Sequence, residues 1–137
     1  MTLRILLAGQ NQKNTDLVRQ ALKQLDVDII RAPGMSLSLF LAKKNQPHLI
    51  IADLELLDGD GLLLMAEMSR DPQLKSMPFI FLLPKKPAST LEKSLLAGGA
   101  RNILCNTSEP KELLNIIGKL IETDQLPLSR CENETTE

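Results

Sequence analysis

Asp53 is the residue whose position in this sequence is best suited to chemistry. It directly follows an apolar run, Leu49 to Ala52, so its carboxylate is expected at the end of a buried strand. Such a carboxylate can help to hold Mg²⁺, which proteins bind through one or two carboxylates together with phosphate oxygens and water. Glu55 and Asp58 follow in the next segment and are the candidates for a second ligand. Asp53 and Glu55 therefore define a candidate metal site, expected to be weak or absent because only Asp53 is firmly placed there.

Other catalytic and binding motifs are missing from the sequence. There is no Gly-rich phosphate-binding loop of the P-loop or dinucleotide type. His48 is the single histidine, and it has no nearby Ser or Cys nucleophile to activate, so we interpret it as a surface or half-buried side chain. Cys105 and Cys131 show no metal-ligand spacing. We therefore expect no catalytic residue, no enzymatic activity and no cofactor apart from weakly bound Mg²⁺.

Composition and charge exclude several classes of partner. The chain has 137 residues, a size typical of one domain, and a net charge of -1, which gives no field that would attract nucleic acid or an anionic membrane. Three Phe are the only aromatic residues, so base stacking is largely excluded. The apolar run at residues 3–8 is far shorter than a membrane span requires. We expect a cytoplasmic protein that binds neither nucleic acid nor membrane.

Apolar runs of strand length alternate with amphipathic stretches of helix length. The predicted strands are residues 5–8, 27–30, 49–52, 79–83 and 102–105, and the predicted helices lie near 16–25, 35–44, 62–70, 90–97 and 110–121. Thr15-Asp16 is expected to cap the first helix, and Ser89 or Thr90 the fourth. A domain over residues 1–122 and a polar tail over 123–137 follow from this pattern.

This alternation predicts an α/β fold with five βα units and a parallel sheet covered by helices on both faces. Ligands of such sheets bind at the carboxyl ends of the strands. Residues 9–10, Asp53, residues 83–84 and Asn106 each follow a predicted strand, so they are expected to meet at that edge.

One segment resembles the receiver domain of bacterial response regulators. A hydrophobic strand ends in Asp53, and a loop with the turn Gly59-Asp60-Gly61 leads to the next helix, as in that family. The resemblance extends over about residues 3–122 and implies a flavodoxin-like, doubly wound sheet with strand order 2-1-3-4-5. It also implies that Asp53 stands at the phosphoacceptor position.

The other active-site positions of that family are altered here. The expected acidic pair falls on Gly9 and Gln10, the expected Thr or Ser on Leu83, and the expected Lys on Asn106. The aromatic switch residue falls on Ile103. Phosphoryl transfer to a carboxylate needs a cation and positioned donors for the developing charge, and loss of each charge-assisted contact costs roughly 1.5–3 kcal/mol. This pocket is therefore predicted to be degenerate.

The resemblance implies a stand-alone, atypical receiver in two-component phosphorelay signalling, which acts mainly through protein–protein interaction. The expected partner is a histidine kinase or another signalling domain, bound on the face of residues 84–121, which includes Lys85, Lys86 and Ile103. In an alternative interpretation, Asp53 is a relic that only accepts backbone N–H groups of its own loop. Two further alternatives are a small-molecule or nucleotide-binding domain of flavodoxin-like fold, and a domain that now only forms a homodimer.

Overall fold

The computed structural model describes residues 2–124, and the side chains of residues 2–120. Twelve elements follow one another in the described part of the chain. They are β1 (Leu3–Ala8), α1 (Gln12–Ala21), β2 (Val27–Ala32), α2 (Met35–Asn45), β3 (Leu49–Ala52), β4 (Glu55–Leu56), β5 (Gly59–Asp60), α3 (Gly61–Ser69), β6 (Phe79–Leu83), α4 (Ser89–Ala97), β7 (Asn102–Cys105) and α5 (Pro110–Asp124). All five predicted strands and all five predicted helices are present.

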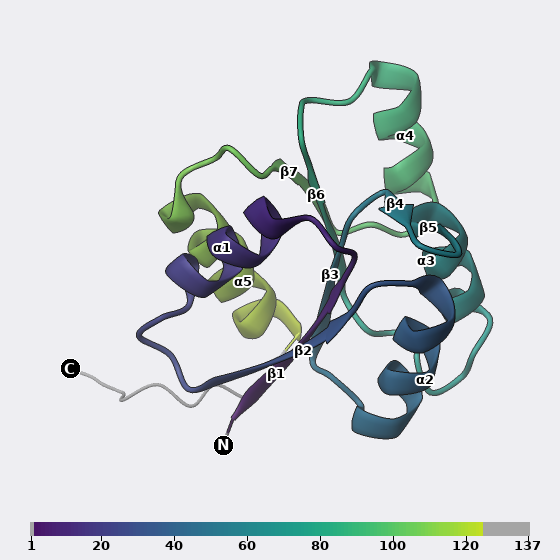
Figure 1. The fold of residues 1–137 in the computed structure, drawn as a ribbon, viewed down its shortest axis with the longest axis horizontal. Coiled ribbons are helices and arrows are strands. Elements are labelled where there is room, and N and C mark those ends of the chain that lie inside the picture. Colours follow the sequence, from purple (N-terminus) through teal and green to yellow (C-terminus); the bar gives the residue numbers. More distant parts are fainter. Residues whose placement is uncertain (1, 125–137) are drawn as a thin grey trace.

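Five parallel strands form the central sheet in the order β2-β1-β3-β6-β7. This is the predicted order 2-1-3-4-5, because β4 and β5 belong to a separate two-stranded hairpin. Helices α1 and α5 cover one face of the sheet, while α2, α3 and α4 lie on the other (Figure 1). The doubly wound, flavodoxin-like architecture is confirmed.

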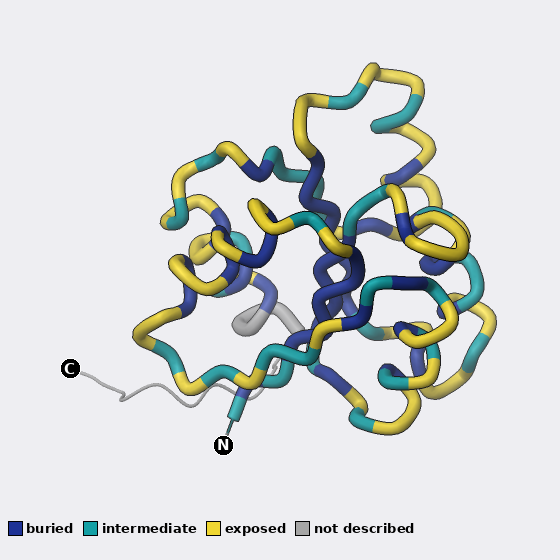
Figure 2. The backbone as a smooth tube through the Cα atoms, viewed as in Figure 1, coloured by how far each residue is buried: buried dark blue, intermediate teal, exposed yellow. Residues whose placement is uncertain are grey.

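Two apolar clusters hold these layers together, one on each face of the sheet. The strands are buried along the centre of the molecule, as Figure 2 shows, and every residue of β3 and β6 is buried. Burial of continuous apolar strands on both faces is the arrangement expected of a parallel sheet. Helix α1 packs on the sheet through a stripe of apolar residues, in which Leu17 and Val18 are 6% and 0% exposed.

Two predicted helix caps are wrong. Helix α1 begins at Gln12, and its N-cap is Asn11, whose side chain accepts a hydrogen bond from the Lys13 N–H at 2.9 Å. Thr15 therefore lies inside the helix, where it is buried. Helix α4 begins at Ser89 after Ala88, and no side chain caps it.

Helix α2 packs through other residues than its largest apolar ones. Leu37 and Phe40 have the spacing of a buried helical stripe, yet they are 43% and 57% exposed. The helix instead buries the small residues Ser38 and Ala42. The Ser38 hydroxyl donates to the Gly34 carbonyl at 2.7 Å, which satisfies its polar group inside the core.

The segment between β3 and α3, predicted as a loop, contains the short antiparallel hairpin of β4 and β5. Asp60 ends this hairpin and caps α3, because its side chain accepts the Leu63 N–H at 2.7 Å.

At the C-terminus, α5 runs two residues past the predicted domain end at 122, and the rest of the predicted tail lies outside the described residues. Among the described helices, none combines the length and the apolar character that a membrane crossing would require.

Candidate functional site at Asp53

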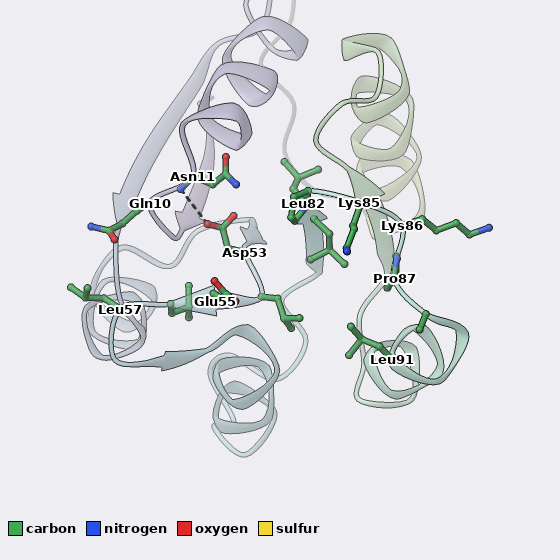
Figure 3. A pocket seen from close by; sticks show the side chains of 15 residues that line it. Gln10, Asn11, Asp53, Glu55, Leu57, Leu82, Lys85, Lys86, Pro87 and Leu91 are labelled. Atoms are coloured by element: carbon green, nitrogen blue, oxygen red, sulfur yellow. Dashed lines mark hydrogen bonds between the residues drawn. The ribbon is translucent and has the colours of Figure 1, made fainter.

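Asp53 lies at the carboxyl end of β3, directly beside the ends of β1 and β6. Its carboxylate is turned toward the start of α1. Oδ2 accepts the backbone N–H of Asn11 at 3.2 Å (Figure 3), and Oδ1 accepts the side-chain amide of Asn14. In the alternative in which Asp53 is a relic, its carboxylate accepts N–H groups of its own loop. In the structure the donors come instead from Asn11 and Asn14, in the segment that follows β1.

Gly9 is needed for this arrangement. Its φ of 126° lies in the region that side chains rarely adopt. A Cβ atom at this position would lie 2.9 Å from Cβ of Asp53 and would overlap its carboxylate. In this conformation, therefore, the position where the resemblance expects a first acidic residue has no room for a side chain.

Asn14 connects Asp53 with the end of β7. This side chain is 1% exposed, and its NH₂ group also donates to the Leu82 carbonyl at 3.2 Å. Its Oδ1 accepts the side-chain amide of Asn106 at 2.8 Å. Asn106 is 6% exposed, and its own Oδ1 has no hydrogen-bond partner within the described structure.

The Asp53 carboxyl group is perturbed electrostatically. Burial raises its pKa from 3.8 to about 6, because desolvation disfavours the charged form. The backbone N–H groups of Asn11 and Gln10 oppose this rise, and the negative charge of Glu55 adds to it. A raised pKa indicates that the N–H donors compensate only part of the desolvation of the carboxylate.

The predicted pocket residues take different positions around Asp53. The Gln10 side chain is exposed and points away from the carboxylate (Figure 3). Leu83 is 3% exposed and presents only its backbone carbonyl, which accepts the Asn106 N–H at 2.8 Å. Asn106 lies near Asp53, as expected, but it reaches the carboxylate only through Asn14.

Asp53 and Glu55 are the two carboxylates that line the cavity at this site. No cluster of three or more His, Cys, Asp or Glu side chains suited to a metal occurs in the part of the chain that the structure describes. Glu55 lies on the same wall of the cavity as Asp53 (Figure 3). The Asp58 carboxylate is committed elsewhere, because it accepts the backbone N–H groups of Met35 and Ser36 at the start of α2. A hydrogen bond from the Ser36 side chain, together with those from the two backbone N–H groups, lowers the pKa of Asp58.

A cavity of about 720 Å³ opens beside Asp53, between the β4–β5 hairpin and the loop that follows β6. Its walls are mainly leucine and proline side chains, including Leu57, Leu82 and Leu91. Lys85 and Lys86 are exposed at its rim, and Lys86 extends outward (Figure 3). Ile103 is half-buried against the core, so its accessible surface is smaller than that of the two lysines.

Sequence reasoning missed Asn11 and Asn14, the two residues that hold the carboxylate. Asn11 donates through its backbone N–H, which its residue type does not reveal, and the role of Asn14 depends on residues far away in the sequence. The predicted start of α1 was also four residues too late, so Asn14 was not placed inside the helix.

Comparison with known proteins agrees with this geometry. Residues 5–118 match the sequence profile of the response regulator receiver domain. Response regulator Rcp1 of Synechocystis sp. is 27% identical over 121 residues, which cover 82% of this chain and 80% of that protein. A response regulator structure from Desulfuromonas acetoxidans has a TM-score of 0.75 at 25% identity, covering 88% of this chain and 97% of that one. The structure of the Mn²⁺-bound form of Rcp1 has a TM-score of 0.70 and 20% identity in the structural alignment, covering 91% and 97%.

Proposed function

The chain belongs to the response regulator receiver domain family of two-component signalling, and we propose that it works there as an atypical receiver whose output does not depend on phosphorylation of Asp53. In this proposal it binds a protein partner through a preformed surface. The observation that carries the proposal is the closure of the Gly9 position against Asp53, which leaves no room for an acidic side chain there.

Three further features of the site support the proposal. A family member such as Rcp1 takes Mn²⁺, but here Asp53 is engaged by N–H donors and Gln10 points away. Leu83 offers no hydroxyl to a phosphoryl oxygen, and Asn106 offers no cation. A phosphoryl group on Asp53 would therefore lack the hydroxyl and the ammonium that the resemblance expects at positions 83 and 106. We infer that any Mg²⁺ binding through Asp53 and Glu55 is weak.

The proposed partner surface is the face of residues 84–121, which contains α4, β7 and most of α5. This range holds six basic and three acidic residues, a net charge of +3 in a chain whose total is -1. Helix α4 buries only Leu95, so most of it is exposed to a partner, as Figure 2 shows. Leu96 is 47% exposed and offers an apolar contact beside the exposed lysines. This surface fits a signalling protein, such as a histidine kinase, that presents an acidic patch around an apolar contact.

The phosphorylation part of the proposal is tested with Mg²⁺ and acetyl phosphate, followed by intact-mass measurement, and with beryllofluoride followed by NMR. We expect no phosphoryl adduct and no shift of the resonances around Asp53. A Mg²⁺-dependent adduct that is lost in Asp53→Asn would overturn this part.

The interaction part is tested by affinity capture and binding measurement with candidate kinases. The double variant Lys85→Glu/Lys86→Glu should weaken binding at least tenfold, while addition of Mg²⁺ and acetyl phosphate should leave the binding of the unaltered chain unchanged. Lys75→Glu reverses an exposed charge before β6, at the opposite end of that strand from Lys85 and Lys86, and is the matched control. Equal binding by the double variant and the control would exclude this surface. Sedimentation of the free chain shows whether a second copy occupies it instead.

A further inference from the structure

Two buried asparagines, Asn14 and Asn106, form the most unusual polar feature of the described structure. Fully buried amide side chains are uncommon and normally satisfy their hydrogen bonds. The NH₂ group of Asn14 donates two hydrogen bonds and its oxygen accepts one, whereas Asn106 forms a side-chain hydrogen bond only through its NH₂ group. The two side chains come from positions 92 residues apart, so this contact joins the start of the fold to its end.

The direction of these hydrogen bonds is fixed by chemistry. The Leu82 carbonyl can only accept, so the side-chain atom of Asn14 that faces it must be the NH₂ group. The Oδ1 atom of Asn14 then faces Asn106, which must donate its own NH₂ group. The unpaired Oδ1 of Asn106 is a consequence of this order. Rotating the Asn14 amide would place its oxygen against two acceptors, and rotating the Asn106 amide would place its oxygen against Oδ1 of Asn14 and leave its NH₂ group unpaired.

The two amides together span the distance between Asp53 and the end of β7. Asn106 follows β7 directly, and its backbone N–H is also tied to the Leu83 carbonyl at the end of β6. An asparagine at position 106 does not itself contact the carboxylate, and Asn14 supplies the missing link. The link is neutral, so it orients the Asp53 carboxylate without a cation.

We propose that Asn14 is the positioning residue of Asp53, and that the Asn14–Asn106 amide pair couples the carboxylate to the connection between β7 and α5. This inference rests on the proposed function, since it describes how a receiver without the usual charges retains a link from Asp53 to its partner face. Asn14 holds the Asp53 carboxylate toward α1. Through the hydrogen bond between Asn14 and Asn106, a change in the charge of Asp53 alters the environment of residues 105–109.

The experiment follows the titration of Asp53 by NMR in the free full-length chain, without metal or phosphodonor. In the unaltered protein, the side-chain amide of Asn106 and the backbone amides of residues 105–109 should titrate with the same midpoint as the Asp53 carboxyl carbon. Asn106→Ala should abolish this response at 105–109 and change the midpoint of Asp53 little. Asn14→Ala should abolish the response and raise the midpoint by about one pH unit, because a hydrogen bond to the charged form is lost. Asn115→Ala removes an exposed amide on α5 and should change neither observation.

A midpoint unaffected by Asn14→Ala, or a response at 105–109 that survives Asn106→Ala, would overturn the proposal. Asn14 is more deeply buried than Asn106, so Asn14→Ala is the variant at greater risk of unfolding. If it does unfold, the response of residues 105–109 in Asn106→Ala tests the proposal alone. The test involves no phosphodonor and no partner, so its failure is distinguishable from failure of the proposed function. An adduct on Asp53 would overturn that function and leave the coupling intact.

Discussion

Replacement of Gly9 by alanine tests directly whether the β1–α1 turn is closed against Asp53. Two costs are expected. The φ of 126° is a conformation that costs a side-chain residue about 1–3 kcal/mol. The new Cβ also overlaps the Asp53 carboxyl group, and relief of such overpacking by small shifts costs typically about 1–3 kcal/mol. We therefore expect Gly9→Ala to lower the free energy of unfolding by about 2–6 kcal/mol, a large part of the 5–15 kcal/mol typical of a domain.

A second glycine of this chain separates the two costs. Gly99 has a φ of 116°, but a Cβ there meets no atom within 4 Å. Gly99→Ala should therefore lose only the conformational part, about 1–3 kcal/mol. The difference between the two losses of unfolding free energy measures the cost of the overlap with Asp53. Both free energies are measured by urea unfolding at one pH, with the slope checked for constancy.

The overlap should also disappear when the carboxyl group is removed. In a double-mutant cycle, Asp53→Ala should recover about 1–2 kcal/mol of the Gly9→Ala loss, since the carboxyl atoms are gone and only Cβ of residue 53 remains close. The reasoning is refuted if Gly9→Ala costs no more than Gly99→Ala and the cycle is additive within about 0.5 kcal/mol.

Three other outcomes are expected. Because the folded-state pKa of Asp53 lies above its usual 3.8, the folded state binds more protons between about pH 4 and 6, and stability should fall as the pH rises through this window. The partial exposure of Asp53 reduces the expected loss of unfolding free energy to about 1–2 kcal/mol. This loss is measured by urea unfolding at pH 4 and pH 7, and it should be absent in Asp53→Asn. Gly61→Ala should lower the melting temperature through a cost of about 2–3 kcal/mol, because its Cβ would lie 2.6 Å from the Phe81 ring, whereas Gly118→Ala, with open space on α5, should be neutral or stabilising. Asp58→Ala should lower the midpoint of urea unfolding by removing the acceptor at the start of α2, whereas Asp58→Asn should lower it less, because asparagine can also supply this cap. Equal losses in the two variants would contradict this role.

The fold could be predicted because its strands carry a strong local signal. Runs such as Phe79–Leu83 are apolar without interruption, which occurs in strands buried on both faces, and the helices between them require parallel connections. Asp53 could be placed at the strand-end edge for the same reason. The helix ends were less predictable, since Asn11, Thr15 and Asp16 all have side chains suited to a cap, and tertiary contacts with Asp53 select the first of them.

The packing of α2 was not predictable from its apolar residues alone. Leu37 and Phe40 have the spacing of a buried stripe, yet the helix approaches β1 and β2 through Ser38 and Ala42, whose small side chains allow close contact. Lys44 lies 5.8 Å from the centre of the exposed Phe40 ring, a cation–π contact that partly covers it. Similarly, no sequence pattern marks Asn14, because its role depends on residues 39 and 92 positions away.

The hydrogen bonds that Asp53 accepts give it a structural role that is independent of phosphorylation. Its carboxylate sits at the N-terminus of α1, where the N–H groups of the first turn have no partners within the helix and the helix dipole favours a negative charge. Asn11 and Asn14 lie three residues apart on one side of that helix, so both can donate to the same carboxylate. An apolar residue at position 53 would leave the Asn11 N–H without this acceptor and would free one hydrogen of the buried Asn14 amide, which costs about 1–3 kcal/mol for each unsatisfied group. Hydrogen bonding alone thus explains an aspartate at position 53, and its presence is weak support for phosphoryl transfer in this receiver.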